Sequence, residues 1–208
     1  MTDDFIITDG LLSEYRGSAA RVKIPDGVRA VGYNAFYRRK ELREIEIPDG
    51  TERILDWAFA GCVRLERVVL PPSVRSVGKG AFLGCAALKE AVFSEGLEEI
   101  GTGAFKFCKN LSRAYLPRTL KAVGASAFGE CDRLLCLYFP IGVERVGKEV
   151  LAGGGFKTIF SEAREKPNGW DADFDVSADD GWEIARCCTI WGYCERNGEI
   201  TYNPKNKE

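Results

Sequence analysis

Hydrophobic residues recur along most of this chain with a period of 23 residues. Four residue types keep this period independently, so chance does not explain their common register. They are the prolines Pro25, Pro48, Pro71, Pro117 and Pro140, with Ser94 at the remaining position; the Ala-Phe pairs ending at Phe36, Phe59, Phe82, Phe105 and Phe128; the leucines Leu42, Leu65, Leu88, Leu111 and Leu134; and the cysteines Cys62, Cys85, Cys108 and Cys131. A fixed period of this length predicts a solenoid of stacked coils.

The unit from Leu42 to Leu65 shows how one coil is built. Its L-x-x-I-x-I pattern over residues 42–47 predicts a short strand that turns its apolar residues inward. Pro48 ends the strand, because proline fixes φ and offers no N–H to a sheet. The Ala-Phe pair at Phe59 fits one or two helical turns on the opposite side of the coil. The sequence therefore predicts an α/β solenoid with a parallel sheet on one side and short helical turns on the other.

Stacking places equivalent residues of successive coils in columns that point inward. No single coil could close a core, whereas stacked coils bury such columns continuously. In most coils a glycine occupies one tight position. In the second coil Leu55 stands at this position instead. The inward columns are Val22, Ile45, Val68, Ala91, Ala114 and Leu137; Ile24, Ile47, Leu70, Phe93, Leu116 and Phe139; and Val31, Ile54, Val77, Ile100, Val123 and Val146; the glycines are Gly32, Gly78, Gly101, Gly124 and Gly147.

Both ends of the chain depart from the period. The apolar residues on either side of Asp9-Gly10 predict a hairpin with a two-residue turn, which covers the first coil. At the far end, Leu151 replaces the phenylalanine, glycines follow at 153–155, and residues 156–159 are predicted to form a last strand. We therefore divide the chain into an N-terminal cap hairpin (1–18), a repeat solenoid (19–160) and a C-terminal cap and tail (161–208).

The C-terminal segment 161–208 lacks the repeat but is rich in tryptophan and cysteine. Its composition predicts a compact cap, followed after Tyr202 by a frayed tail. The residues on which this rests are Trp170, Trp182 and Trp191, with Cys187, Cys188 and Cys194.

The repeat unit, written LPPSVRSVGKGAFLGCAAL over residues 70–88, resembles the BspA-like leucine-rich repeat of bacterial proteins. The resemblance covers about residues 20–160, and residues 158–170 and 191–193 are similar to the closing sequences of many such proteins. It implies a curved solenoid with the parallel sheet on its concave face and the helical turns on its convex side. Members of the family are described as surface binding proteins and adhesins.

The amino-acid composition excludes most of the common catalytic mechanisms. The chain has no histidine, which excludes Ser-His-Asp triads, Cys-His pairs and His-ligated metals. A net charge of -2 gives no indication of nucleic-acid binding. The start is acidic and no segment reaches the roughly 20 apolar residues of a membrane helix. We therefore expect a cytoplasmic protein without membrane insertion, or a cell-surface location if the chain is a fragment of a longer protein.

The cysteines and aspartates offer no convincing metal or catalytic site. The ladder cysteines lie 23 residues apart, whereas structural zinc sites use close pairs, so packing with a weak S–H bond to the backbone is favoured. The acidic run in the tail alternates without the glycine and terminal glutamate of a calcium loop, which favours a solvated loop. Its members are Asp171, Asp173, Asp175, Asp179 and Asp180. We expect no catalytic residue, metal or cofactor.

Two columns of the predicted sheet face outward. In a parallel sheet equivalent residues lie about 4.8 Å apart, so the first column, which alternates in sign, should form lateral ion pairs. The second becomes apolar and aromatic toward the C-terminal half. The first column is Arg21, Glu44, Arg67, Glu90, Arg113 and Cys136; the second is Lys23, Glu46, Val69, Val92, Tyr115 and Tyr138, followed by Phe160.

The apolar stretch of the second column admits two interpretations. Exposed tyrosine beside arginine is typical of a binding surface. Alternatively, these residues are ordinary strand formers that stack on one another, or the cap covers them. On the first interpretation the binding residues are Arg67, Val69, Val92, Arg113, Tyr115, Cys136, Tyr138 and Phe160.

The leading functional hypothesis is a non-enzymatic module that binds a protein partner through the concave sheet. The alternative is a structural or adhesive spacer that self-associates or forms part of a larger surface protein. An enzyme built on aspartates or cysteines of the tail is the third hypothesis. The identity of a partner does not follow from a repeat scaffold, because one fold serves unrelated functions.

Overall fold

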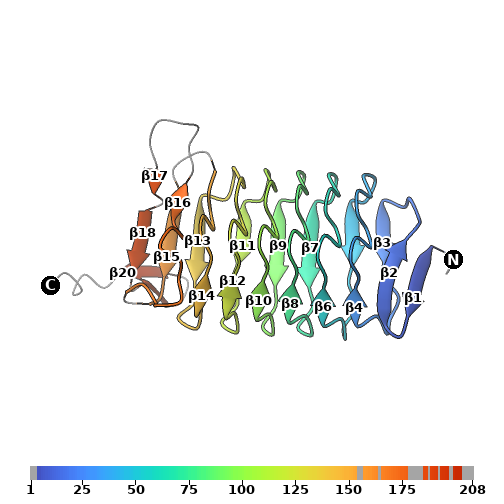
Figure 1. Ribbon diagram of the computed structural model, residues 1–208, viewed down its shortest axis with the longest axis horizontal. Helices are drawn as coiled ribbons and strands as arrows, with labels where there is room; N and C mark the ends of the chain where they lie inside the picture. Colours follow the sequence, from blue (N-terminus) through green and yellow to red (C-terminus); the bar gives the residue numbers. More distant parts are fainter. Residues whose placement is uncertain are drawn as a thin grey trace.

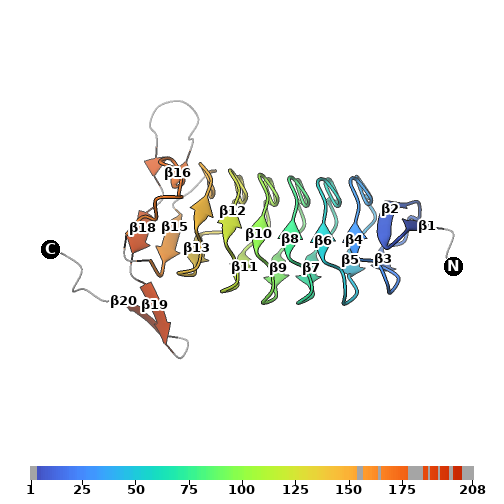
Figure 2. The ribbon, with the colours of Figure 1, turned by 60° about the horizontal axis from the view of Figure 1, so that its bottom comes forward.

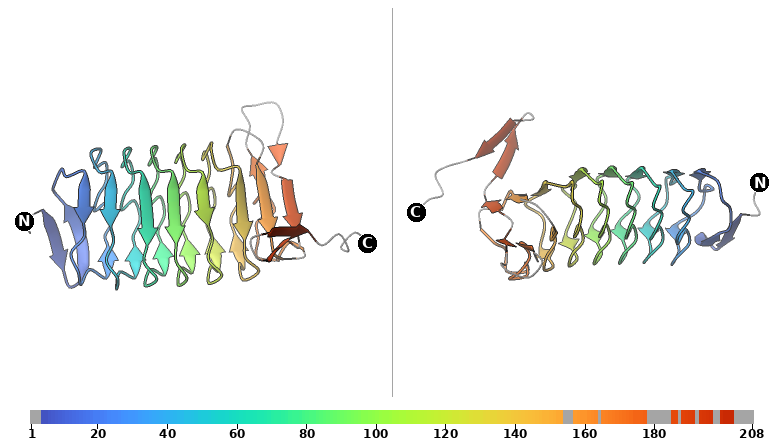
Figure 3. Two further views of the ribbon diagram at one scale, coloured as in Figure 1. Left: turned by 180° about the vertical axis from the view of Figure 1, so that it is seen from behind. Right: turned by 90° about the horizontal axis from the view of Figure 1, so that it is seen from above.

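The computed structural model describes residues 4–153, 157–163, 165–177, 185–186, 188–191, 193–196 and 199–202. Successive coils stack in a row along the longest axis of the molecule, from β1 (Phe5–Thr8) at one end to β18 (Cys188–Trp191) at the other (Figure 1). Each repeat contributes one strand to each of two parallel sheets, which form two separate rows along the stack (Figure 3). The predicted solenoid is therefore confirmed.

The first sheet contains the strands predicted from the L-x-x-I-x-I pattern, and we call it the wide sheet. Its order is β11-β9-β7-β5-β3, and β13 lies beside β11 and continues it as a second group, β13-β15-β18. The strands are β3 (Arg21–Lys23), β5 (Glu44–Glu46), β7 (Arg67–Leu70), β9 (Glu90–Phe93), β11 (Arg113–Tyr115), β13 (Cys136–Phe139), β15 (Thr158–Ser161) and β18.

The second sheet, which we call the narrow sheet, was not predicted. Each repeat enters it with two residues, and the second of them belongs to the predicted column from Val31 to Val146. These short strands form a row along the stack (Figure 2). Its order is β1, β2 (Leu11–Tyr15), β4 (Ala30–Val31), β6 (Arg53–Ile54), β8 (Ser76–Val77), β10 (Glu99–Ile100), β12 (Ala122–Val123) and β14 (Arg145–Val146).

The predicted N-terminal hairpin is confirmed. Strands β1 and β2 pair antiparallel with Thr8 opposite Leu11, which leaves Asp9-Gly10 as a two-residue turn. Both turn residues have positive φ, 51° and 79°, as the favoured hairpin turn requires. Strand β2 then pairs parallel with β4, so the hairpin covers the open edge of the first coil.

The predicted short helical turns are wrong, because no helix occurs in the described residues. Twice in each coil, four residues apart, the chain adopts a left-handed conformation that a right-handed helix does not contain. In the second coil these residues are Trp57 and Gly61, with φ of 60° and 73°. The equivalent positions elsewhere are Asn34 and Arg38, Gly80 and Gly84, Gly103 and Phe107, Ser126 and Glu130, and Glu149 and Gly153.

Backbone hydrogen bonds show what replaces the helix. The N–H groups of this segment alternate, one donating within its own coil and the next donating to the following coil. Ala60 N donates to Trp57 O at 3.0 Å, whereas Phe59 N donates to Ala81 O at 2.7 Å. The segment is thus a series of tight turns bonded from coil to coil, which satisfies its backbone groups without a helix.

The core is a continuous column of aromatic rings flanked by the predicted aliphatic columns. Phe36, Phe59, Phe82, Phe105 and Phe128 are fully buried, and neighbouring rings stack with centroids 4.9 to 5.4 Å apart. Tyr15 of the hairpin extends this stack at 4.9 Å from Phe36. The phenylalanines that recur every 23 residues therefore form a continuous buried spine.

Adjacent coils approach most closely at the repeated glycine position. A Cβ on Gly124 would lie 2.3 Å from the backbone nitrogen of Thr102 in the preceding coil, a distance that a real side chain does not allow. Gly124 does not have a positive φ, so the close approach of two backbones demands glycine here. The predicted tight position is confirmed, and Leu55 is its single exception among the coils.

The sequence repeat ends near Phe160, but the coil geometry continues beyond it. The prediction that residues 156–159 form the last strand is wrong. The strand observed there is Thr158–Ser161, and β18 pairs parallel with it as a further strand of the sheet. Trp170 forms a parallel bridge with Val146 and continues the narrow sheet by one position. Pairing of this kind needs only backbone groups, which is why it outlasts the repeated side chains.

The remaining strands form two antiparallel pairs, β16 (Val176–Ser177) with β17 (Ala185–Arg186), and β19 (Tyr193–Arg196) with β20 (Glu199–Tyr202). Several predicted features of the cap lie outside the described residues. These are Gly154, Gly155, Phe156, Asp179, Asp180, Trp182, Cys187 and residues 203–208, together with the side chains of Cys188, Trp191 and Cys194.

Candidate binding surface on the wide sheet

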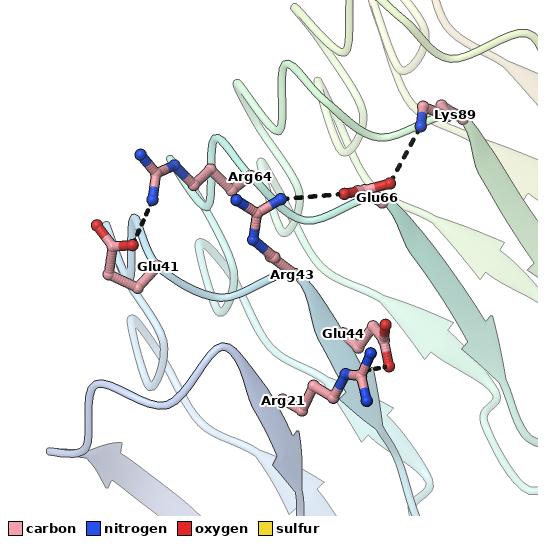
Figure 4. A network of polar contacts seen from close by, with 7 residues as sticks. All are labelled: Arg21, Glu41, Arg43, Glu44, Arg64, Glu66 and Lys89. Atoms are coloured by element: carbon pink, nitrogen blue, oxygen red, sulfur yellow. Dashed lines mark hydrogen bonds and ion pairs between the residues drawn. The ribbon is translucent and has the colours of Figure 1, made fainter.

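The charged outward column of the wide sheet has the predicted register. Arg67 lies opposite Glu90, and Glu90 lies opposite Arg113. Glu90 pairs with both neighbours, at 2.7 Å from Arg67 Nε and 3.9 Å from Arg113 Nη1. Arg21 pairs with Glu44 at 3.2 Å in the same way (Figure 4). The predicted lateral ion pairs are confirmed, and because they are exposed each contributes about 0–1 kcal/mol.

The column ends at Cys136 on β13, where a half-buried thiol replaces the charge. Its Sγ donates a weak hydrogen bond to the Tyr138 hydroxyl at 3.7 Å. Cys136 is a free cysteine two residues from Tyr138 on the same strand face, so the structure places it within the candidate surface.

The apolar outward column also has the predicted register, and its exposure is uneven. Val69 lies opposite Val92, Val92 opposite Tyr115, and Tyr138 opposite Phe160. The Tyr138 and Phe160 rings stack at 4.7 Å with an interplanar angle of 8°, and both are half-buried. Stacking therefore explains these two residues without a ligand.

Tyr115 is different, because 64% of its surface is exposed. Val69 is also exposed, so the interpretation that the cap covers the column does not hold for these two residues. Tyr115 follows Arg113 by two residues, and the two side chains share one strand face. We call the outward surface of β7, β9, β11, β13 and β15 the wide face.

The structure adds a hollow that the sequence reasoning missed. It has a volume of about 450 Å³ and lies where β7, β9 and β11 begin. Arg67, Glu90 and Arg113 line it from the first residues of these strands. The other lining residues precede the strands and are Glu66, Lys89, Asn110, Ser112 and Arg133. For Glu66, Lys89 and Ser112 the signal in the sequence was a further 23-residue column, which begins at Arg43 and lies immediately before the outward charged column.

Ion pairs organise one side of this hollow. Glu66 accepts from Arg43 at 3.3 Å and from Lys89 at 3.0 Å, and so joins three coils (Figure 4). The hydrogen bond and charge of Lys89 hold the pKa of Glu66 below its ordinary value, with Arg43 adding to the effect. Glu66 is consequently ionised at neutral pH, and its charge is shared between two cations.

The four ladder cysteines are packing residues, as predicted. Cys62, Cys85, Cys108 and Cys131 are fully buried, and each Sγ donates to a phenylalanine carbonyl of the preceding coil at 3.1 to 3.3 Å. Burial raises the pKa of Cys108 well above its ordinary value and that of Cys131 to about 12. The reactive thiolate is therefore disfavoured at Cys108 and Cys131.

The described part of the acidic tail forms a local turn. Asp171 and Asp173 are exposed, and Asp171 Oδ1 accepts from Asp173 N at 2.9 Å, while Asp175 accepts from the Thr189 hydroxyl at 3.2 Å. In the residues described here, no three His, Cys, Asp or Glu side chains gather as metal ligands would. Across the same residues, no helix has the length and apolarity needed to cross a membrane.

Comparison with known proteins shows which repeat family and which solved structures this chain resembles. A family model described as "BspA type Leucine rich repeat region" matches residues 14–155 in six copies. The crystal structure of the T. pallidum leucine rich repeat protein is similar, with 27% identity, a TM-score of 0.56, and coverage of 77% of this chain and 70% of that one.

A leucine-rich repeat protein from Eubacterium ventriosum is similar at 19% identity with a TM-score of 0.59. The match covers 77% of this chain and 48% of that one, so the chain matches about half the length of this relative and rather more of the T. pallidum protein. No curated protein matches the sequence. Because six copies of the family model together span more than half of its length, this chain belongs to the BspA type leucine-rich repeat family.

Proposed function

We propose that the protein is a non-enzymatic binding module that docks a protein partner on its wide face, the face predicted to be concave. Leucine-rich repeat proteins of this kind are generally interaction or structural modules. The observation that carries the proposal is Tyr115, which is 64% exposed and follows Arg113 on β11, at the boundary between the two groups of strands of the wide sheet. Neither stacking nor burial explains this side chain. Tyrosine and arginine are the residues that most often dominate protein interfaces.

The scaffold supports this role because it is rigid. Each repeat bonds to the next along the narrow sheet and the turns, and along the wide sheet within its two groups β11-β9-β7-β5-β3 and β13-β15-β18, while the phenylalanine stack joins the coils inside. A surface held in this way loses little conformational freedom when a partner docks, which favours affinity. The proposed contact residues are Arg67, Val69, Val92, Arg113, Tyr115, Cys136, Tyr138 and Phe160.

The test compares Tyr115→Asp with Tyr33→Asp. Both tyrosines are 64% exposed, but Tyr33 lies beyond β4, away from the strands of the wide sheet. The two variants therefore match in chemistry, exposure and charge. We expect Tyr115→Asp to weaken capture of a partner from an extract of the source organism by about tenfold or more, as loss of an interface anchor does, and Tyr33→Asp to leave it unchanged.

Circular dichroism first establishes that both variants remain folded. If the captured proteins are the same and equally abundant for the original chain and both variants, the wide face is not the docking surface.

The second candidate is a structural or adhesive spacer, which the lateral ion pairs and the continuous stack also favour. It predicts a mass that rises with concentration in light scattering. It further predicts that Tyr115→Asp and Tyr33→Asp behave alike in capture, so the same pair of variants separates the two functions.

A further inference from the structure

We propose that the hollow at the start of β7, β9 and β11 binds an acidic peptide segment of the partner, through carboxylate groups that pair with Arg113 and Arg133. This inference rests on the proposed function, because it names the chemistry of the partner at one part of the wide face. The hollow has a volume of about 450 Å³ and shares Arg67 and Arg113 with the surface around Tyr115.

The charge of the hollow is the first argument. Four cations line it, Arg67, Lys89, Arg113 and Arg133, against the two carboxylates Glu66 and Glu90. Two positive charges are therefore in excess at one place on a chain whose net charge is -2. An excess of this kind attracts anionic groups and raises the rate at which they encounter the surface.

The pairing within the hollow shows which cations are available. Glu66 is shared between Arg43 and Lys89. Glu90 pairs closely with Arg67, at 2.7 Å, and only loosely with Arg113, at 3.9 Å. Arg133 is exposed and forms no ion pair with any residue in the described part of the chain. Arg113 and Arg133 are consequently the two guanidinium groups with capacity for an incoming carboxylate, which they can bind in bidentate fashion.

The spacing of these arginines favours an extended peptide. They come from neighbouring coils but not from equivalent positions: Arg113 is the first residue of β11, whereas Arg133 lies three residues before β13, so the two side chains are separated both across the sheet and along the strands. Alternate side chains of an extended peptide lie about 7 Å apart, so a peptide with several acidic residues on one face can offer a carboxylate to each arginine, which a single free carboxylate cannot do. Glu66 and Glu90 interrupt the cations of the hollow, whereas surfaces that bind nucleic acid are continuous basic patches.

Fluorescence anisotropy with labelled hexaglutamate tests the proposal on the full chain at about 0.05 M salt, where exposed charges are weakly screened. Hexaglutamine is the uncharged control. The double variant Arg113→Gln with Arg133→Gln is compared with Arg53→Gln with Arg145→Gln on the narrow sheet. Both double variants lower the net charge equally, so a difference between their affinities for hexaglutamate depends on where the arginines lie. Arg53 and Arg145 are exposed, as are Arg113 and Arg133.

We expect hexaglutamate to bind, the first double variant to weaken it by about tenfold, and the narrow-sheet control to change it by less than about twofold. Absence of hexaglutamate binding, or equal weakening in both double variants, overturns the proposal. Equal binding of hexaglutamine, of a single-stranded oligonucleotide, or complete displacement by equimolar inorganic phosphate also overturns it.

These outcomes are distinct from those of the proposed function. Hexaglutamate binding with no effect of Tyr115→Asp on partner capture leaves the hollow as an acidic-peptide site and removes the wider docking surface. Loss of partner capture in Tyr115→Asp without any hexaglutamate binding does the reverse.

Discussion

Replacing Phe82 by alanine is expected to lower the free energy of unfolding by about 3–5 kcal/mol. Phe82 is fully buried in the middle of the stack, with its ring 5.1 Å from that of Phe59 and 5.0 Å from that of Phe105. The coils on either side are each bonded to the coil of Phe82, so their backbones cannot close on the space that the ring leaves. A cavity therefore remains and adds to the lost burial. Urea denaturation followed by circular dichroism measures the change.

Two controls accompany this variant. Phe82→Leu keeps most of the volume and should cost less than the alanine variant. Val63→Ala, at a residue that is 40% exposed, should change stability by less than about 0.5 kcal/mol. A loss below about 1 kcal/mol for Phe82→Ala would contradict the stacked core as the main source of stability.

Trp170→Ala is expected to have a comparable effect, about 3–5 kcal/mol, although Trp170 lies outside the repeat. Its side chain is only 3% exposed and packs with centroids 5.0 Å from both Phe139 and Phe174. Its indole N–H donates to Val143 O at 3.0 Å, and its backbone bridges Val146. Trp170 thus closes the C-terminal end of the core, as Tyr15 closes the N-terminal end.

Trp170→Phe separates the two contributions of this side chain. It retains an aromatic ring but removes the N–H, so a loss of about 1–3 kcal/mol is expected from the unsatisfied carbonyl and reduced packing. The same urea titration measures both variants. If Trp170→Ala unfolds at the same urea concentration as the original chain, the segment after Phe160 is not part of the folding unit.

The register of the wide sheet was predictable because a fixed period determines it. Once residues 23 apart are taken as neighbours, the pairing of Arg67 with Glu90 and of Val92 with Tyr115 follows directly, and the structure has both. The weak hydrogen bonds from the ladder cysteines to the backbone were predicted from the same periodicity. The side chains of a solenoid are repeated, and so are their environments.

The helical turns were predicted wrongly because the sign of φ is not visible in an Ala-Phe pair. Gly80 and Gly84, four residues apart, were the available signal. Trp57 and Phe107 hide it, because they adopt the same left-handed conformation with large side chains. The narrow sheet was missed for a different reason: strands of two residues are too short to show an alternating pattern.

Only some of the residues that line the hollow could be predicted from the sequence. Arg67 and Arg113 were named as candidate site residues from their outward column, whereas Lys89 and Arg133 precede their strands and carried no strand signal. Strand β18 could not be predicted, since it pairs with β15 in register but begins 30 residues after it, beyond the end of the repeat.

Site-specific photo-crosslinking tests the docking surface most directly. A photoreactive phenylalanine derivative is placed at Tyr115 in one protein and at Tyr33 in another, and each is irradiated in an extract of the source organism. The wide face predicts adducts with a distinct partner protein from position 115 and none of that partner from position 33. Equal adducts from both positions, or adducts only between copies of this chain, would contradict it.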